Sequence, residues 1–152
     1  MSASKEPAIS LRRAERSEDV ATCLRLRWTV FVEEQGVPPS LEVDEHDSAT
    51  ETVHALALLD GVPAGAGRFV PEGPGRVKIG RMAVIDDARG RGLGEALLAF
   101  LEEQALRQGA TAATLSAQVH ARGFYEKHGY AAQGEVFDDA GIPHVRMDKT
   151  LP

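Results

Sequence analysis

The sequence has a single cysteine, Cys23, so no disulfide can form within the chain. It also lacks a long apolar run, because stretches such as residues 55–59 are far too short to span a bilayer. The first residues, 1–7, contain no apolar signal core, so we expect neither export nor a membrane partner. Together these absences favour a reducing, cytoplasmic location.

Excess positive charge is also missing. The chain carries 17 lysines and arginines against 23 acidic residues, which gives a formal net charge of −6 at pH 7. Nucleic-acid binding requires a basic face, so we expect no nucleic-acid partner. Cys23 itself falls within an apolar helical pattern, which favours a buried structural thiol over a nucleophile.

Size and composition indicate one folded domain. Hydrophobic residues make up 43% of the 152 residues and charged residues 26%, as in ordinary soluble proteins with a real core. We expect a loose tail over residues 1–8 and a single domain over residues 9–152. The expected element order is β-α-β-β-β-α-β-α-β-β, which indicates an α/β or α+β fold with a mixed sheet flanked by helices.

Hydrophobic periodicity places these elements along the chain. The expected strands cover residues 9–13, 53–59, 62–70, 77–85, 112–118, 130–137 and 145–149. The expected helices cover residues 17 to about 35, 91–108 and 120–128. Gly65 and Gly67 lie inside a strand and suggest a bulge or the close approach of another group.

An acidic run extends from Glu33 to Asp47. Such a patch would attract a cationic substrate such as an amine, although most charge runs are solvated loops. Residues 40–50 have the composition of a polar loop. Residues 44–47 are all acidic or histidine, but adjacent positions in one loop rarely all point at one ion, so we expect no metal site.

A glycine-rich loop over residues 89–94 joins an expected strand to an expected helix. Its sequence, Arg-Gly-Arg-Gly-Leu-Gly, places three alternate glycines and two arginines where the helix begins. The first amides of a helix lack acceptors and carry the positive end of its dipole, so the expected ligand is a phosphate or pyrophosphate. The alternative is an ordinary strand-to-helix turn that is rich in glycine.

Two common phosphate motifs fit this loop poorly. A P-loop requires Gly-Lys-Ser/Thr, which the loop does not contain. A dinucleotide fingerprint requires a third glycine where this chain has Glu95, and it opens a βαβ unit, whereas hairpin strands are expected before this loop.

The loop instead resembles the acetyl-CoA-binding motif of the GCN5-related N-acetyltransferase (GNAT) family, Gln/Arg-x-x-Gly-x-Gly/Ala. Residues 89–94 match it as Arg-x-x-Gly-x-Gly after a strand that ends near Val84. Residues 118–130 resemble a second family motif, Asn-x-x-Ala-x-x-Leu/Phe-Tyr-x-x-x-Gly-Phe. The resemblance extends over residues 9–151. Similarity to the ElaA-type subgroup lies in residues 30–35, 117–120 and 141–144.

The resemblance implies a single-domain acyl-CoA N-acyltransferase fold with a mostly antiparallel sheet. It implies direct transfer of an acetyl group from acetyl-CoA to a primary amine of a small molecule or peptide, in a ternary complex without a metal. Many relatives are dimers, so a homodimer is one expected assembly. The cofactor-binding residues that the resemblance implies are Met82, Ala83, Val84, Arg89, Gly90, Arg91, Gly92, Leu93, Gly94, Gln118 and Tyr125.

Each of these groups has an expected task within that reaction. Amides of residues 89–94 would bind the pyrophosphate, and the strand edge at residues 82–84 would pair with the peptide-like pantetheine arm. An amide of that edge would stabilise the oxyanion. Tyr125, a phenol that stays protonated at neutral pH, would give a proton to the departing thiolate. The alternative for Tyr125 is a ring packed at a helix–sheet seam.

Gln118 stands where the family commonly has Asn, and its amide would orient the cofactor or bridge splayed strands.

The incoming amine must lose a proton, so a base is needed, directly or through water. The candidates are Glu33, Glu34, His54, His120 and His144. Some family members place a glutamate four residues before Met82, where this chain has Lys78. Position favours Glu34, at the end of the first expected helix, and His120, beside a strand end, as catalytic residues.

Two other functions remain open from the sequence. The main alternative is a non-catalytic sensor that kept the fold and binds CoA or another phosphate ligand, and the third is a structural or partner-binding domain. Thioester turnover distinguishes them from an enzyme. The acceptor pocket is expected in loops 35–50 and 138–144. Arg81 would either pair with an acid of the substrate site or make an ordinary salt bridge.

Overall fold

The computed structural model describes residues 8–152, so nearly all of the expected tail over residues 1–8 lies outside the described residues. Ala8 already belongs to the fold, because its amide donates to Oδ1 of Asp60 and its carbonyl accepts from the Asp60 amide, both at 2.8 Å. The strands are β1 (Ile9–Arg13), β2 (Val53–Leu59), β3 (Val62–Pro71), β4 (Arg76–Val84), β5 (Ala112–Gln118), β6 (Ala131–Asp139) and β7 (Ile142–Thr150). The helices are α1 (Ser17–Arg27), α2 (Pro39–Glu42), α3 (Leu93–Arg107) and α4 (Arg122–Lys127), with a π-helix η1 (Trp28–Glu34) and 3₁₀ turns η2 (Glu45–Ser48), η3 (Asp86–Ala88) and η4 (Val119–Ala121).

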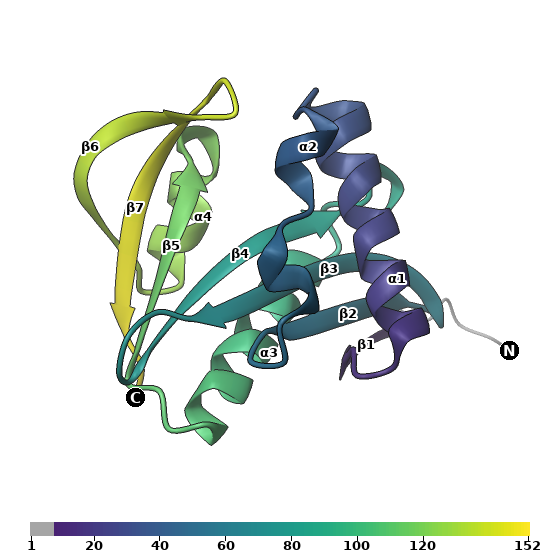
Figure 1. Cartoon of the computed structure of the whole chain (residues 1–152), viewed down its shortest axis with the longest axis horizontal. Helices are drawn as coiled ribbons and strands as arrows, with labels where there is room; N and C mark the ends of the chain where they lie inside the picture. The colour runs from purple at the N-terminus through teal and green to yellow at the C-terminus, as the bar shows by residue number, and fades with distance from the viewer. Residues whose placement is uncertain (1–7) are drawn as a thin grey trace, which may run out of the picture.

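All seven strands form one sheet in the order β1-β2-β3-β4-β5-β7-β6. Within the described sheet, β4 and β5 pair in parallel and every other neighbouring pair is antiparallel. This confirms the expected single-domain fold with a mixed, mostly antiparallel sheet. In Figure 1, strands β1 to β4 form one wing of the sheet, and β5, β7 and β6 form the other.

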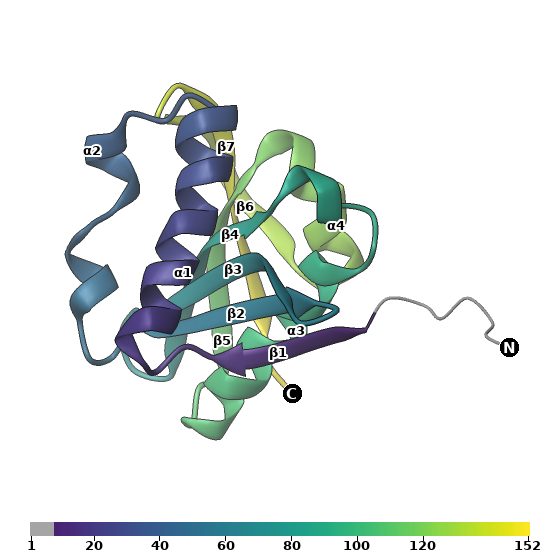
Figure 2. The same ribbon diagram turned by 90° about the vertical axis from the view of Figure 1, so that its right-hand side faces the viewer.

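β2 is buried on both faces of the sheet, because its alternate side chains enter two different cores. Val53, Ala55 and Ala57 join the core that contains the leucines of α3. Leu56 joins a smaller core with Cys23 of α1, so α1 and α3 cover opposite faces (Figure 2). Burial raises the pKa of the Cys23 thiol to about 12, which fits the structural role that the sequence favours.

Glycines in β3 let α3 lie very close to the sheet. A Cβ atom at Gly65 would lie 3.1 Å from Cδ1 of Leu97, and one at Gly67 would lie 3.0 Å from Cδ1 of Leu101. The register of β3 against β4 also shifts at Gly67. Both features expected from these glycines, a bulge and a close approach, are confirmed. Neither α3, at 15 residues, nor any other helix in the described chain is long and apolar enough to cross a membrane.

β4 and β5 separate after a short paired stretch. Their pairing covers residues 76–79 of β4 and 112–115 of β5, and β4 then continues beside β3 alone. A bulge follows at Arg81, whose φ of 53° is in the left-handed region. Because of this bulge, Ile79 and Met82 contact the same core although they are an odd number of residues apart in the strand. Figure 1 shows the two strands side by side near the C-terminus and diverging toward the top of the view.

The segment between α1 and β2 differs from the polar loop expected over residues 40–50. The first helix continues past Arg27 as η1 and ends at Glu34, close to its expected end. After it, α2 and η2 form two short turns in which Glu42 and Asp47 are buried. The segment is ordered in this way because its acids find buried arginine partners, which form part of the site.

Candidate active site

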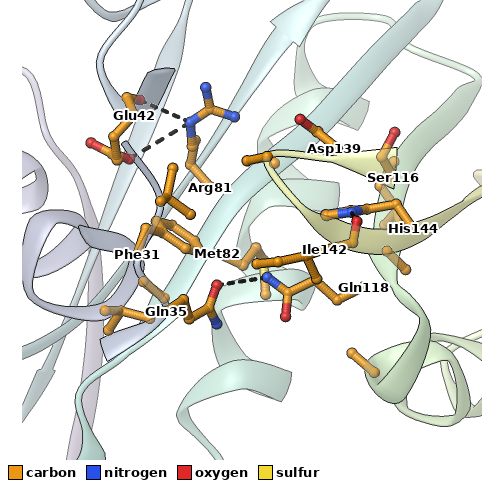
Figure 3. Close-up of a pocket in the computed structure, with 18 of the residues that line it drawn as sticks. Phe31, Gln35, Glu42, Arg81, Met82, Ser116, Gln118, Asp139, Ile142 and His144 are labelled. Atoms are coloured by element: carbon orange, nitrogen blue, oxygen red, sulfur yellow. Dashed lines mark hydrogen bonds and ion pairs between the residues drawn. The ribbon is translucent and has the colours of Figure 1, made fainter. Parts of the chain in front are cut away.

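The divergence of β4 and β5 opens a cavity of about 530 Å³ between the two strands. Its lining comes mainly from the divergent ends of both strands, from η1 and α2, from η4 and α4, and from the turn between β6 and β7 (Figure 3). Apolar side chains such as Phe31, Met82 and Ile142 alternate with polar ones. The ionisable side chains of the lining are Glu34, Glu42, Lys78, Arg81, Arg89, His120, Tyr125, Asp139 and His144.

The segment that enters α3 presents a run of free backbone donors. The amide N–H groups of residues 90–95, here called the donor loop, have no hydrogen-bond acceptor within residues 8–152. The first amide of the helix to find one is Ala96, which donates to the Gly92 carbonyl at 3.0 Å. Gly92 has a φ of 90°, so the chain turns directly from the loop into the helix. Unpaired amides at the start of a helix form a site for a phosphate-like anion.

The two arginines of this segment have different surroundings. The Arg89 amide donates to the Asp86 carbonyl at 3.2 Å, which corrects the expected run of donors: it begins one residue later. The Arg89 guanidinium donates to the Val84 carbonyl at 2.9 Å and to the two oxygens of Glu34 at 2.9 and 2.8 Å. Arg89 therefore fastens η1 to the end of β4. Arg91 is exposed, and no ion-pair partner for it lies in the part of the chain that the structure describes.

Tyr125 lines the cavity from α4. Its ring makes edge-to-face contacts with Phe124, at 5.0 Å between centroids, and with Tyr130, at 5.9 Å. Burial raises the pKa of the Tyr125 phenol to about 12, so the hydroxyl stays protonated at neutral pH. No described residue hydrogen-bonds that hydroxyl, whereas the Tyr130 hydroxyl donates to Glu102 at 2.7 Å. The Tyr125 ring is therefore packed as the structural alternative expects, while its hydroxyl has no partner among the described residues and remains free to donate a proton.

Three polar side chains form a hydrogen-bonded chain along the cavity wall. Nε2 of Gln118, at the end of β5, donates to Oε1 of Gln35 at 2.8 Å, as Figure 3 shows. Oε1 of Gln118 accepts from Nε2 of His120 at 2.6 Å. Gln118 therefore joins the end of β5 to Gln35, the residue that follows η1. It does not bridge the two splayed strands, which was one of its two expected roles.

A mostly buried network of three arginines and three carboxylates extends from the cavity wall into the protein, and sequence reasoning missed it. This acid–arginine network consists of Arg27, Glu42, Asp44, Asp47, Arg68 and Arg81. Arg27, which is 1% exposed, donates to Glu42 at 2.9 Å and to the two oxygens of Asp47 at 2.6 and 3.1 Å. Arg68 donates to Asp44 and to Asp47, each at 2.7 Å. Buried charges require such partners, because an unpaired ion loses its hydration without compensation.

The expected acidic surface patch is wrong for Glu42, Asp44 and Asp47, because arginines of the network bind these acids. Although burial alone would raise the pKa of Asp47, hydrogen bonds and charge from Arg27 hold that pKa well below its usual range. The hydrogen bond from Arg68 lowers the pKa of Asp44 in the same way. These acids therefore bind arginines and do not face a cationic substrate. The signal in the sequence was Arg27, which falls on the apolar face of its expected helix and so requires buried acids.

Arg81 connects the acid–arginine network to the cavity. Its Nε donates to the Glu42 carbonyl at 3.1 Å (Figure 3). Its Nη2 donates to the Leu41 carbonyl and to Asp44, both at 3.3 Å. Its side chain also lines the cavity. Arg81 therefore makes salt bridges with Glu42, which lines the cavity, and with Asp44 behind it; whether Glu42 belongs to a substrate site stays a prediction.

Most of the residues predicted for the site come together in this cavity. Those that line it are Met82, Ala83, Val84, Arg89, Gln118, Tyr125, Glu34, His120 and His144. Gly90, Arg91, Gly92, Leu93 and Gly94 form the adjoining donor loop instead. Two candidate bases lie elsewhere: Glu33 is exposed, and His54 is buried with Nε2 3.2 Å from the Asp47 carbonyl, where burial lowers the pKa of the imidazole. Across residues 8–152, no three His, Cys, Asp or Glu side chains group in a way that could hold a metal ion.

Known proteins resemble this chain over nearly its full length. A family model for the acetyltransferase (GNAT) domain matches residues 14–151. The Bacillus subtilis protein named N-acetyltransferase YjcF is 39% identical over 138 residues, which cover 90% of this chain and 96% of YjcF. The crystal structure of an acyl-CoA N-acyltransferase from Pseudomonas aeruginosa is 33% identical with a TM-score of 0.82, covering 95% of this chain and 99% of that one. The crystal structure of Escherichia coli ElaA is 26% identical with a TM-score of 0.83, covering 93% and 99%.

Proposed function

Because this chain belongs to the GNAT acetyltransferase family, we propose that it transfers the acetyl group of acetyl-CoA directly to a primary amine in the cavity between β4 and β5. The family makes it an acyltransferase, and the transfer takes place in a ternary complex without a covalent enzyme intermediate. One observation carries the location of the site: the edge of β4 loses its strand partner beside the donor loop, and Tyr125 lines the same cavity.

The residues present fit the two parts of acetyl-CoA. The amides of the donor loop, with Arg91 beside them, suit the pyrophosphate. The edge of β4 over residues 80–84, which has no partner on its β5 side within the described sheet, suits the peptide-like pantetheine arm. The Val84 carbonyl already accepts a hydrogen bond from Arg89, so the pantetheine arm would pair with the residues of β4 that precede Val84. When bound, the thioester supplies the activated acetyl group.

Tyr125 is the general acid of the proposed reaction. As the carbon–sulfur bond breaks, the hydroxyl donates its proton to the departing thiolate, which becomes the free thiol. Its raised pKa of about 12 keeps that proton in place until the thiolate forms. An amide of the β4 edge stabilises the oxyanion. The acceptor amine must in turn lose a proton, and Glu34, His120 and His144 line the cavity as candidates for that task.

The test is release of CoA thiol from acetyl-CoA with putrescine, phenethylamine, lysine and a short glycyl peptide as acceptors. We expect Tyr125→Phe to lower kcat by about 10²-fold or more, the usual contribution of a general acid, while calorimetry shows unchanged acetyl-CoA binding. Tyr130→Phe is the matched control, because it removes the same hydroxyl outside the cavity lining and should leave kcat unchanged.

The outcomes separate the proposal from its alternatives. Full turnover by Tyr125→Phe would remove the acid role. A parent protein that binds CoA but acetylates no amine would favour the non-catalytic sensor. A parent protein with no affinity for CoA would contradict both.

A further inference from the structure

His144 occupies a central position in the cavity. It lies on β7 directly opposite Gln118 of β5, and Figure 3 shows its ring directed toward the middle of the cavity. The ring stacks on Phe137 of β6, with 6.0 Å between centroids and 27° between planes. Two neighbouring strands and one aromatic ring therefore hold the imidazole in place.

A single hydrogen bond determines which nitrogen of His144 carries the proton. Nδ1 lies 2.7 Å from the Ile142 carbonyl oxygen. A carbonyl only accepts, so Nδ1 must be the protonated nitrogen of the neutral ring. Nε2 then carries the lone pair, and no described residue hydrogen-bonds it. The imidazole is thus oriented as a base with its acceptor nitrogen free.

The other candidate bases in the cavity are already engaged. Both oxygens of Glu34 bind the Arg89 guanidinium. Nε2 of His120 donates to Gln118, and the His120 side chain is exposed, so water competes for its second nitrogen. Oε1 of Glu42 accepts from Arg27, and although Oε2 has no hydrogen-bond partner among the described residues, the carboxylate is 2% exposed and its charge is paired with that arginine. His144 is the candidate of the described lining that is both half-buried and free at its basic nitrogen.

We propose that Nε2 of His144 is the general base that takes the proton from the acceptor amine. The inference rests on the proposed acetyl transfer. The amine nitrogen forms a bond to the thioester carbonyl carbon, and its proton moves to Nε2 of His144. The carbon–sulfur bond then breaks, and the leaving sulfur takes the proton of Tyr125. The imidazolium returns one proton to the tyrosinate, directly or through water, so both side chains recover their starting states.

Several charged and titratable groups share the cavity with this imidazole and enter any pH profile. Those in the lining are Glu34, Glu42, Lys78, Arg81, Arg89, His120, Tyr125 and Asp139. Glu34 and Glu42 are paired with arginines, and Arg81 binds Asp44. A variant of His144 separates its contribution from theirs because these groups stay in place.

His144→Asn provides the sharpest test. The Asn amide can keep the hydrogen bond to the Ile142 carbonyl but offers no basic nitrogen. With acetyl-CoA and the best acceptor of the amine panel, we expect kcat/KM at pH 7 to fall by about 10²–10⁴-fold, the usual contribution of a general base. The loss should shrink as pH rises, because hydroxide can then take the amine proton in place of the imidazole. His46→Asn, at an exposed histidine of η2, is the matched control and should change neither value.

The outcomes distinguish this inference from the proposed function. A parent protein that acetylates no amine counts against the function itself. An active parent whose His144→Asn variant keeps its rate and pH profile overturns the role of His144 alone. Nitrogen NMR of the imidazole in the parent protein tests the proposal without any variant: we expect the Nδ1–H tautomer, and the Nε2–H tautomer would overturn it.

Discussion

Arg91 differs from the arginines around the cavity, because among residues 8–152 it has no carboxylate within ion-pair distance. Arg81 and Arg89 each bind carboxylates and backbone carbonyls of the cavity wall. Their guanidinium groups therefore serve mainly to hold segments together. Arg91 stands beside the unpaired amides of the donor loop, where an added phosphate would find both a positive charge and N–H donors.

Reversal of the charge at this position should weaken binding of the phosphate end of the cofactor. We expect Arg91→Glu to raise the KM for acetyl-CoA about tenfold or more, since a hydrogen bond to a charged group contributes about 1.5–3 kcal/mol. Acetyl-pantetheine lacks the pyrophosphate, so its KM should not change. Arg25→Glu, at an exposed arginine of α1, is the control. An equal effect on both thioesters would place the pyrophosphate elsewhere.

At the scale of elements, the acid–arginine network holds one wall of the cavity in place. It joins α1, α2, the start of η2, β3 and the bulge of β4 through six charged side chains. Arg81 adopts its left-handed backbone at that bulge while its side chain binds two carbonyls and Asp44. The short turns of α2 and η2 depend on these contacts, because little apolar surface fixes them.

Loss of one charge from this network should destabilise the fold. We expect Arg27→Met to lower the free energy of unfolding by about 3–5 kcal/mol, because it leaves buried carboxylates without their partner. Arg25→Met, two residues earlier on the exposed face of α1, should change it by about 0.5 kcal/mol at most. Urea unfolding of both variants measures the difference, and equal stabilities would contradict the role assigned to the network.

The sequence predicts regular elements better than it predicts this network. Periodic apolar residues were enough to place β2, β4 and α3, and the glycines at 65 and 67 indicated a close approach, although not that α3 is the element that approaches. Glu42 and Asp47 could not be placed in the same way, because an acidic run has the same composition whether it is solvated or bound by arginines from distant strands. The orientation of His144 depends on one backbone carbonyl, which no pattern of residue types specifies.

At the scale of the whole molecule, the paired acids and the buried histidine make stability depend on pH. The pKa values of Asp44 and Asp47 are lowered in the folded chain, mainly through hydrogen bonds from Arg68 and Arg27 that outweigh burial. The pKa of His54 is lowered by burial. In each case the unfolded chain binds the proton more readily, so stability rises with pH between the folded and unfolded values.

The lowered pKa values predict that stability changes with pH in two ranges. The His54 contribution should be complete above its ordinary pKa of 6.5 and should decline as pH falls below that value. The contribution of the two aspartates should be complete above 3.8 and should decline below it. Urea unfolding from pH 8 to pH 3, compared with His54→Gln, should show the upper decline only in the parent protein. A parent whose stability stays constant down to pH 4 would contradict the assignment for His54.

Binding of acetyl-CoA depends most on the separation of β4 from β5, which leaves a strand edge and the donor loop free for the two ends of the cofactor. Amide NMR spectra recorded while CoA or acetyl-pantetheine is added test it most directly. We expect CoA to shift the amide signals of residues 90–95 and of the β4 edge, and acetyl-pantetheine to shift the β4 edge alone. Binding of CoA that leaves the signals of residues 90–95 unmoved would contradict the account.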